Sequence, residues 1–148
     1  MKASPFEPRK RARRRALQAL YQWQITGHEA AEILAQFRAA QDMSGVDEAH
    51  FERLLRGVIA GWQALDEAFE PFLDRPVAQL DLMERAILRI GAYELLHCPE
   101  TPYRVVLDEC IDLAHRFGST DGHSYVNAVL DRMVRQWRGG EPAQSAKP

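Results

Sequence analysis

Apolar residues recur every three or four positions along most of the chain, which is the spacing of one face of an α-helix. The longest stripe covers five turns and consists of Phe51, Leu54, Leu55, Val58, Ile59, Trp62, Leu65 and Phe69. Shorter stripes lie at 16–24, 33–37, 87–96, 106–117 and 126–137. No segment shows the two-residue alternation of a β-strand. The pattern predicts an all-α fold of about six or seven helices.

Capping residues and helix breakers mark where these helices begin and end. Starts are predicted at Ser44 or Asp47, Asp74-Arg75-Pro76, Asp81, Thr101-Pro102 and 119–121. Ends are predicted at Gly27, Pro71, Pro99, Gly118 and Gly139-Gly140. Asp81 and Glu84 have the spacing of a capping box. Because the linkers are short, we expect sequential helices to pack as antiparallel neighbours.

The length of 148 residues fits one domain, and 46% hydrophobic with 27% charged residues is typical of a globular protein. We expect a flexible N-terminal extension at 1–8, a single helical domain at 9–138 and a disordered polar tail at 139–148. No apolar stretch approaches the length of about 20 residues that spans a bilayer. Glutamines interrupt the segment after the first cations, so a signal peptide is not indicated. We expect a cytoplasmic protein without a membrane partner.

Charge is distributed unevenly along the chain. Residues 1–15 carry seven cations and one anion, a local charge of +6, because 9–15 reads Arg-Lys-Arg-Ala-Arg-Arg-Arg. The remaining residues carry 12 cations and 20 anions, a charge of −8. A cationic block of this kind commonly contacts phosphates of a nucleic acid. A solubilising tail or a membrane-surface patch are the alternatives.

Sequence signals for catalysis are weak. The chain has no Gly-rich phosphate loop, nucleophile elbow or HExxH motif. Glu94-x-x-His97 and Asp112-x-x-His115 resemble halves of a two-metal helical site, but one pair carries Asp and further inward carboxylates are needed. Cys98 and Cys110 lack a CxxC spacing and are expected to be reduced thiols. We expect no enzyme, no metal and no cofactor.

Two aromatic features accompany the cationic block. Tyr21 and Trp23 follow it by one to three turns, where their rings can stack on unpaired bases while cations contact the backbone. Both residues can instead belong to the core. We favour the core position for Trp23 and leave it open for Tyr21. The second feature is the helix–helix corner Phe117–Asn127, where Asp121 or a phosphate can occupy a new helix N-terminus and Tyr125 lies one turn further on. This corner can face the cationic block.

Four blocks of the sequence are distinctive when taken together and in order. They are Arg-Lys-Arg-Ala-Arg-Arg-Arg-Ala-Leu-Gln-Ala-Leu-Tyr-Gln-Trp-Gln at 9–24, Met-Glu-Arg-Ala-Ile-Leu-Arg-Ile-Gly-Ala-Tyr-Glu-Leu at 83–95, Pro-Tyr-Arg-Val-Val-Leu-Asp-Glu at 102–109, and Phe-Gly-Ser-Thr-Asp-Gly-His-Ser-Tyr-Val-Asn-Ala-Val-Leu-Asp at 117–131. These blocks resemble the NusB family of bacterial transcription antitermination factors. The resemblance spans roughly residues 9–135 and implies two small antiparallel helical bundles packed together.

The resemblance also implies a role without catalysis. NusB-like proteins bind boxA, a short single-stranded RNA in ribosomal-RNA operon leaders, together with NusE, a ribosomal small-subunit protein. The pair joins other Nus factors on RNA polymerase and suppresses premature termination.

Functional residues of the family transfer to matching positions of this chain. The RNA-binding residues implied are Arg9, Lys10, Arg11, Arg13, Arg14, Tyr21, Asp121 and Tyr125. Glu84 matches a glutamate at the NusE contact. This chain departs from the family pattern at Arg14 and Arg15, which extend the basic run, and at Ser124, where a basic residue can occur. One of the two extra arginines can therefore form a salt bridge instead of contacting RNA.

Two alternative functions keep the same fold. One is a helical protein-interaction scaffold; the other is a module that presents ribosomal RNA, because NusB-like domains also occur fused to ribosomal-RNA cytosine methyltransferases. This chain shows no strand–Gly-rich-loop–helix unit for a methyl donor. Family members occur as monomers and as dimers, so a homodimer stays open.

Overall fold

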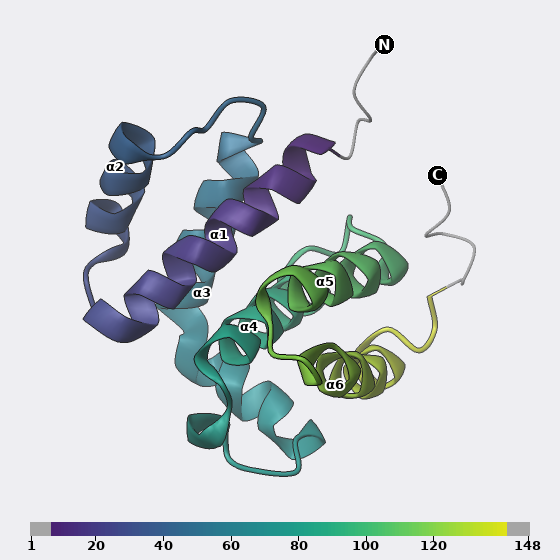
Figure 1. Cartoon of the computed structure of the whole chain (residues 1–148). Coiled ribbons are helices and arrows are strands. Elements are labelled where there is room, and N and C mark those ends of the chain that lie inside the picture. Colours follow the sequence, from purple (N-terminus) through teal and green to yellow (C-terminus); the bar gives the residue numbers. More distant parts are fainter. Residues whose placement is uncertain (1–6, 142–148) are drawn as a thin grey trace. The chain divides into compact units, whose positions relative to one another are not determined.

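The computed structural model describes residues 7–141 and contains six α-helices and two 3-10 turns in that range (Figure 1). The elements are α1 Glu7–Thr26, α2 Ala30–Ala40, α3 Glu48–Phe69, η1 Glu70–Phe72, η2 Val77–Gln79, α4 Leu82–His97, α5 Tyr103–Phe117 and α6 Gly122–Trp137. Within 7–141 there is no strand, and the predicted all-α fold is confirmed. The chain forms two compact units, an N-terminal unit Met1–Ala60 and a C-terminal unit Gly61–Pro148.

The N-terminal unit has its core between α1, α2 and the first half of α3. Leu17 and Leu20 of α1 and Phe51 of α3 are fully buried, and each such side chain contributes about 1.5–3 kcal/mol. The rings of Phe37 on α2 and Phe51 lie 5.9 Å apart. Helix α1 is followed by Gly27, whose φ of 69° lies in the left-handed region that glycine adopts without strain.

Helix α3 begins where the sequence predicts but is interrupted near its middle. Asp47 caps its first turn, since the His50 N–H donates to Asp47 Oδ1 at 3.0 Å. Gly61 has non-helical dihedral angles (φ −115°, ψ 19°) and lies at the boundary of the two units. The long apolar stripe therefore contributes its first part to one unit and its last part to the other.

The C-terminal unit places α4 in contact with both α5 and α6, and α5 in contact with α6 (Figure 1). Helix α4 is buried on most of its circumference, with Ile87, Leu88 and Ile90 fully inaccessible. At Gly91 a Cβ atom would lie 2.7 Å from Leu130 Cδ2 and 3.3 Å from Cys110 Sγ. Because a Cβ atom there would displace the Leu130 side chain, this glycine allows side chains of α5 and α6 to pack directly against α4.

The end of α4 and the beginning of α5 are stabilised by residues after α6. The Arg138 guanidinium donates to the carbonyl oxygens of Leu95 and Thr101, both at 3.0 Å, and of Cys98 at 3.2 Å. It also pairs with Glu141 Oε1 at 2.6 Å, while Glu141 Oε2 accepts the Tyr103 N–H at 2.8 Å. One cation thus satisfies the free carbonyls of a helix C-terminus, and one anion satisfies an amide of the next N-terminus.

Several predicted boundaries need correction. Glu141, expected in a disordered tail at 139–148, is held by Arg138, so ordered structure extends beyond residue 138. Helix α1 begins at Glu7, inside the extension expected at 1–8, and residues 1–6 and 142–148 lie outside the described range. Asp74-Arg75-Pro76, predicted to start a helix, precedes only the 3-10 turn η2. The first N–H of that turn, from Val77, donates to Glu70 Oε2 and not to Asp74. The Asp74 carboxylate instead accepts the Tyr125 hydroxyl.

Candidate nucleic-acid interface

The predicted cations lie along the first turns of α1 and differ strongly in exposure. Arg11 is exposed, and Arg9, Lys10 and Arg14 are partly exposed. Arg13 is only 2% exposed. The helical period explains the difference, since Arg13 shares a face with the buried Ala16, Leu17 and Leu20. The same period, read from the sequence, would have separated Arg13 from its neighbours.

Some of these cations are paired with groups of the same unit. Arg9 Nε lies 3.5 Å from Asp47 Oδ2, and Arg11 Nε lies 3.7 Å from Glu7 Oε2. Both pairs are well exposed, so they hold the guanidinium groups weakly and leave them able to exchange partners. The exposed cations of α1 can therefore serve as phosphate contacts.

Tyr21 lies two turns after Arg14 on α1 and is partly exposed. Its ring is therefore neither a core side chain nor fully in solvent, an environment in which one face can stack while the hydroxyl stays hydrated. Trp23 is also only partly buried, although the sequence favoured a core position for it. Both aromatic residues remain accessible in part.

The α5–α6 corner lies in the C-terminal unit. Helix α5 ends at Gly118, whose N–H donates to the Ala114 carbonyl at 2.9 Å, and α6 begins at Gly122. Asp121 occupies the N-cap position but its side chain makes no capping hydrogen bond. The sequence allowed either Asp121 or a phosphate at this N-terminus, and Asp121 does not cap α6. Its backbone (φ −101°, ψ 0°) is not the extended conformation that a capping residue needs. Its carboxylate is exposed.

Glu84 lies beneath this corner. Asp81 caps α4 as predicted, accepting the N–H groups of Met83 and Glu84 at 3.0 and 3.2 Å. Glu84 is only 8% exposed, and its carboxylate accepts the Ser119 hydroxyl at 2.8 Å. The same carboxylate lies so close to Gly122 that a Cβ atom at that position would collide with it. An anion is thus present near the N-terminus of α6, and it is Glu84.

Tyr125 belongs to a three-residue cluster with Asp74 and Arg75. Its hydroxyl donates to Asp74 Oδ1 at 3.0 Å, and the Arg75 guanidinium carbon lies 4.8 Å from the centre of its ring. Arg75 also donates to both Asp74 oxygens, at 2.6 and 3.0 Å. One face of the Tyr125 ring is therefore covered by a cation that a carboxylate holds in place. The sequence assigned Asp74 and Arg75 to a helix start and carried no signal for this contact across some 50 positions.

Hydrogen bonding and burial in this cluster shift the pKa values of Asp74 and Tyr125. Hydrogen bonds from Arg75, and then from the Tyr125 hydroxyl, lower the pKa of Asp74 to about 2. Burial, and then the hydrogen bond to Asp74, raise the pKa of Tyr125 above its ordinary value. The hydroxyl is therefore protonated and the carboxylate ionised at neutral pH.

Replacing Tyr125 by phenylalanine is expected to raise the pKa of Asp74 part of the way from about 2 toward 3.8, because one donor is lost while Arg75 remains. Stability contributed by Asp74 is complete above about pH 3.8 and is lost as the pH falls through its folded pKa, so the variant should lose it at higher pH. Carboxyl NMR titration measures the shift. Tyr103→Phe is the control, and an unchanged Asp74 titration in Tyr125→Phe would contradict the contact.

Other chemistry suggested by the sequence is absent from the part of the chain that the structure describes. Residues 7–141 contain no group of three or more potential metal ligands. His115, of the Asp112-x-x-His115 pair that resembles half of a two-metal site, stacks on His123 with 4.1 Å between ring centres. None of the helices in the described range is long and apolar enough to cross a membrane.

This geometry defines a class of protein: an all-helical chain whose first helix presents cations and an accessible tyrosine. Comparison of the sequence with models of known protein families makes the class specific. The model of the NusB family matches residues 10–135, and the chain belongs to this family. It is similar to the transcription antitermination protein NusB of Xanthomonas axonopodis pv. citri (strain 306), with 52% identity over 137 residues, covering 93% of this chain and 86% of that protein. NusB of Xanthomonas oryzae pv. oryzae (strain PXO99A) is 53% identical over 130 residues, covering 88% and 83%.

Solved structures agree with this assignment. The structure of T. maritima NusB superposes with a TM-score of 0.77 at 27% identity, covering 92% of this chain and 94% of that one. A crystal structure of the antitermination factors NusB and NusE in complex with dsRNA gives a TM-score of 0.76 at 22% identity, covering 86% and 96%, and shows the shared fold. Family membership makes the chain a transcription antitermination factor and not an enzyme.

Proposed function

We propose that this protein binds the boxA RNA of ribosomal-RNA operons together with NusE and supports antitermination by RNA polymerase with other Nus factors. The observation that carries the proposal is the set of accessible cations on α1 followed by the partly exposed Tyr21. The relatives are transcription antitermination proteins, and a protein of the same fold has been crystallised with NusE and RNA. An RNA-binding adaptor in the cytoplasm accounts for these features together.

In this proposal, α1 supplies the electrostatic part of the affinity. Arg9, Lys10, Arg11 and Arg14 contact phosphates, and Tyr21 stacks on a base. Arg13 remains a predicted contact, but because it is only 2% exposed the proposal rests on the other four.

The C-terminal unit supplies the remaining predicted contacts. Asp121 has an exposed carboxylate that can accept hydrogen bonds from base or sugar donors, and Tyr125 has one ring face beside Arg75. Glu84 is the residue that the resemblance assigns to NusE binding. Because its carboxylate accepts the Ser119 hydroxyl, we propose that Glu84 acts on NusE by holding the α5–α6 corner in position.

The proposal is tested by fluorescence anisotropy with a labelled single-stranded boxA oligonucleotide, a scrambled strand and a boxA duplex, each with and without NusE. We expect the boxA strand to bind more tightly than the scrambled strand and NusE to increase that preference. Equal affinity for all three RNAs in both conditions would contradict it. A protein that binds NusE but none of the RNAs would favour the protein-interaction scaffold. Sedimentation of the free protein decides whether it is a homodimer.

Replacing Tyr21 by alanine is expected to weaken binding of boxA RNA by about 1–3 kcal/mol, roughly 5- to 150-fold, because a base loses its aromatic partner. Tyr21→Phe keeps the ring and is expected to retain most of the affinity. Anisotropy titrations of the three proteins measure the difference. If alanine and phenylalanine behave alike, the ring does not stack on RNA.

A further inference from the structure

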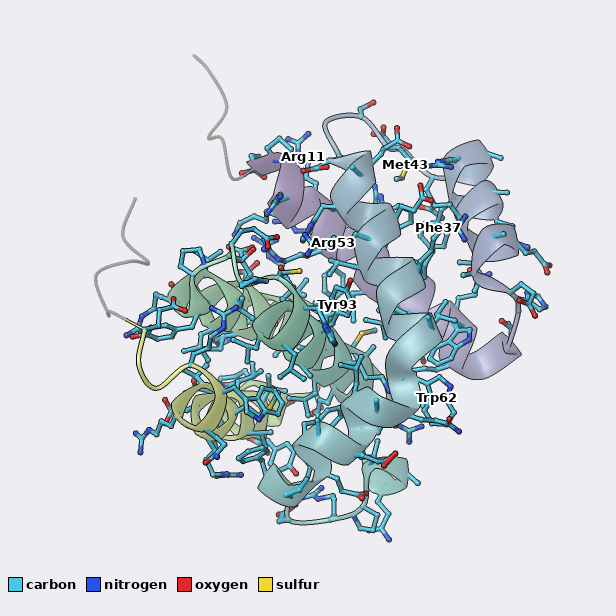
Figure 2. All side chains as sticks on the ribbon, turned by 180° about the vertical axis from the view of Figure 1, so that it is seen from behind. Arg11, Phe37, Met43, Arg53, Trp62 and Tyr93 are labelled. Carbon is cyan, nitrogen blue, oxygen red and sulfur yellow. The ribbon has the colours of Figure 1, made fainter. Side chains whose placement is uncertain are left out.

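The N-terminal unit contains a hollow of about 370 Å³ between α1 and the segment that joins α2 to α3. It is lined by Arg11, Arg14 and Arg15 on one side and by Asp42, Ser44 and Val46 on the other. Figure 2 labels Arg11 near the beginning of α1 and Met43 on the segment that joins α2 to α3. Arg14 and Arg15 follow Arg11 by three and four positions, so both lie on the helix face that Arg11 occupies.

Two of the arginines are positioned by backbone carbonyl groups. Arg15 donates from Nε and Nη2 to the Asp42 carbonyl oxygen at 3.1 and 3.0 Å, and from Nη1 to Gln18 Oε1 at 3.0 Å. Arg11 Nη1 lies 3.4 Å from the Ser44 carbonyl oxygen. Gly45, with φ of 70°, permits this approach because a side chain there would collide with the Arg11 guanidinium. The walls of the hollow are thus ordered before any ligand binds.

Arg14 supplies a donor that the protein itself does not satisfy. Its Nε atom is buried and has no hydrogen-bond partner. A buried donor without a partner costs about 1–3 kcal/mol, so native proteins rarely retain one without a reason. Arg14 lines the hollow, so a small shift of its side chain would let an oxygen atom bound there reach Nε and remove that cost.

The lining carries three cations and one anion. The Asp42 carboxylate accepts the Ser44 N–H at 2.9 Å, and this hydrogen bond, followed by the nearby Arg15 and Arg11 charges, lowers the pKa of Asp42. Asp42 is therefore ionised and shapes the turn, and a net positive charge remains in the hollow. A planar guanidinium held in a fixed position can donate two hydrogen bonds to two oxygen atoms of a phosphate, which a monatomic anion cannot accept in the same way.

We propose that this hollow binds one phosphate group, with Arg14 and Arg15 as its principal ligands. The inference deepens the proposed function and rests on it for the source of the phosphate, which is the RNA backbone. It adds Arg15 and residues 42–46 to the interface and assigns a role to the two arginines in which this chain departs from the family pattern.

The site is tested first without RNA. Inorganic phosphate is titrated into ¹⁵N-labelled protein at constant ionic strength, with chloride as the reference. We expect saturable shifts of the Ser44 and Val46 amides and of the Arg14 Nε–H signal, absent in Arg14→Gln and retained in Arg56→Gln. Arg56 is a matched control because it is an exposed arginine of the same unit, paired with Glu52 outside the hollow. Shifts that are equal for phosphate and chloride would overturn the site.

The same variants are then tested with RNA. Arg14→Gln and Arg15→Gln are each expected to reduce the log–log salt slope by about 0.7, the value for one phosphate on a single strand. Arg56→Gln should leave the slope unchanged. Saturable phosphate binding in a protein that does not bind RNA would keep the site and contradict the proposed function. RNA binding with unchanged slopes in both variants would keep the function and overturn the site.

Discussion

Replacing Asp66 by alanine is expected to lower the free energy of unfolding by about 3–5 kcal/mol, because the substitution removes the carboxylate that is paired with a buried cation. Asp66 of α3 and Arg89 of α4 form two parallel hydrogen bonds, from Nε at 2.9 Å and from Nη2 at 2.7 Å. The two side chains are only 14% and 6% exposed. Water therefore cannot replace the carboxylate at little cost, and Arg89 would lose its main neutralising group.

Urea unfolding followed by circular dichroism measures this loss. Tryptophan fluorescence gives a local signal as well in a background that keeps only Trp62 of the three tryptophans, since the Arg89 guanidinium lies 5.4 Å from the Trp62 ring. Asp131→Ala is the matched control, because its partner Arg135 is 79% exposed and surface pairs contribute only about 0–1 kcal/mol. The double variant Asp66→Leu/Arg89→Met should recover part of the stability, since it removes both charges. A loss in Asp66→Ala no larger than that of the control would refute the explanation.

Neutralising Arg9, Lys10, Arg11 and Arg14 together with glutamine is expected to remove most of the salt dependence of RNA binding. Each phosphate contact contributes about −0.7 to the log–log slope, so four contacts correspond to a decrease in affinity of roughly 50-fold between 50 and 200 mM salt. The variant should bind weakly at low salt and change little as salt increases. Anisotropy titrations at four or more salt concentrations measure the slope.

A control with the same change in net charge separates local contacts from the overall field. Glutamine at Arg38, Arg56, Arg116 and Arg135 removes four exposed cations from α2, α3, α5 and α6. These positions are paired with acidic neighbours and lie outside the proposed interface. We expect the control to keep nearly the full salt slope. If both variants lose it equally, the α1 cations have no specific role in RNA binding.

Periodicity and caps in the sequence predicted the helices well. The apolar stripes correspond to α1–α6, and Asp47, Asp81 and Gly27 function at the helix ends as expected. These features depend on contacts within a few residues, which is why a single sequence reveals them. The same reasoning was less reliable for Asp74-Arg75-Pro76 and Asp121, where a distant or buried group takes the place of the local one.

The candidate site could be predicted only in outline. The cationic block and Tyr21 are visible in the sequence, but the burial of Arg13 depends on which face of α1 packs inward. For Arg15 the sequence left an RNA contact or a salt bridge open, and only the fold places it in one hollow with Asp42, Ser44 and Val46. The Asp74–Arg75–Tyr125 cluster joins residues about 50 positions apart, and nothing local signals their contact.

The sequence by itself therefore determined the helices, their caps, the charge of α1 and the family, because each is encoded in residue type and spacing along the chain. Only the tertiary structure decided which cations are accessible, which carboxylates are engaged and where a phosphate can bind. Those properties arise from burial and from groups brought together across the fold. The free energy of a charged side chain depends on its solvent exposure and on its hydrogen-bond and ion-pair partners. Both depend on residues that are distant in the sequence, so they cannot be read from residue type and spacing.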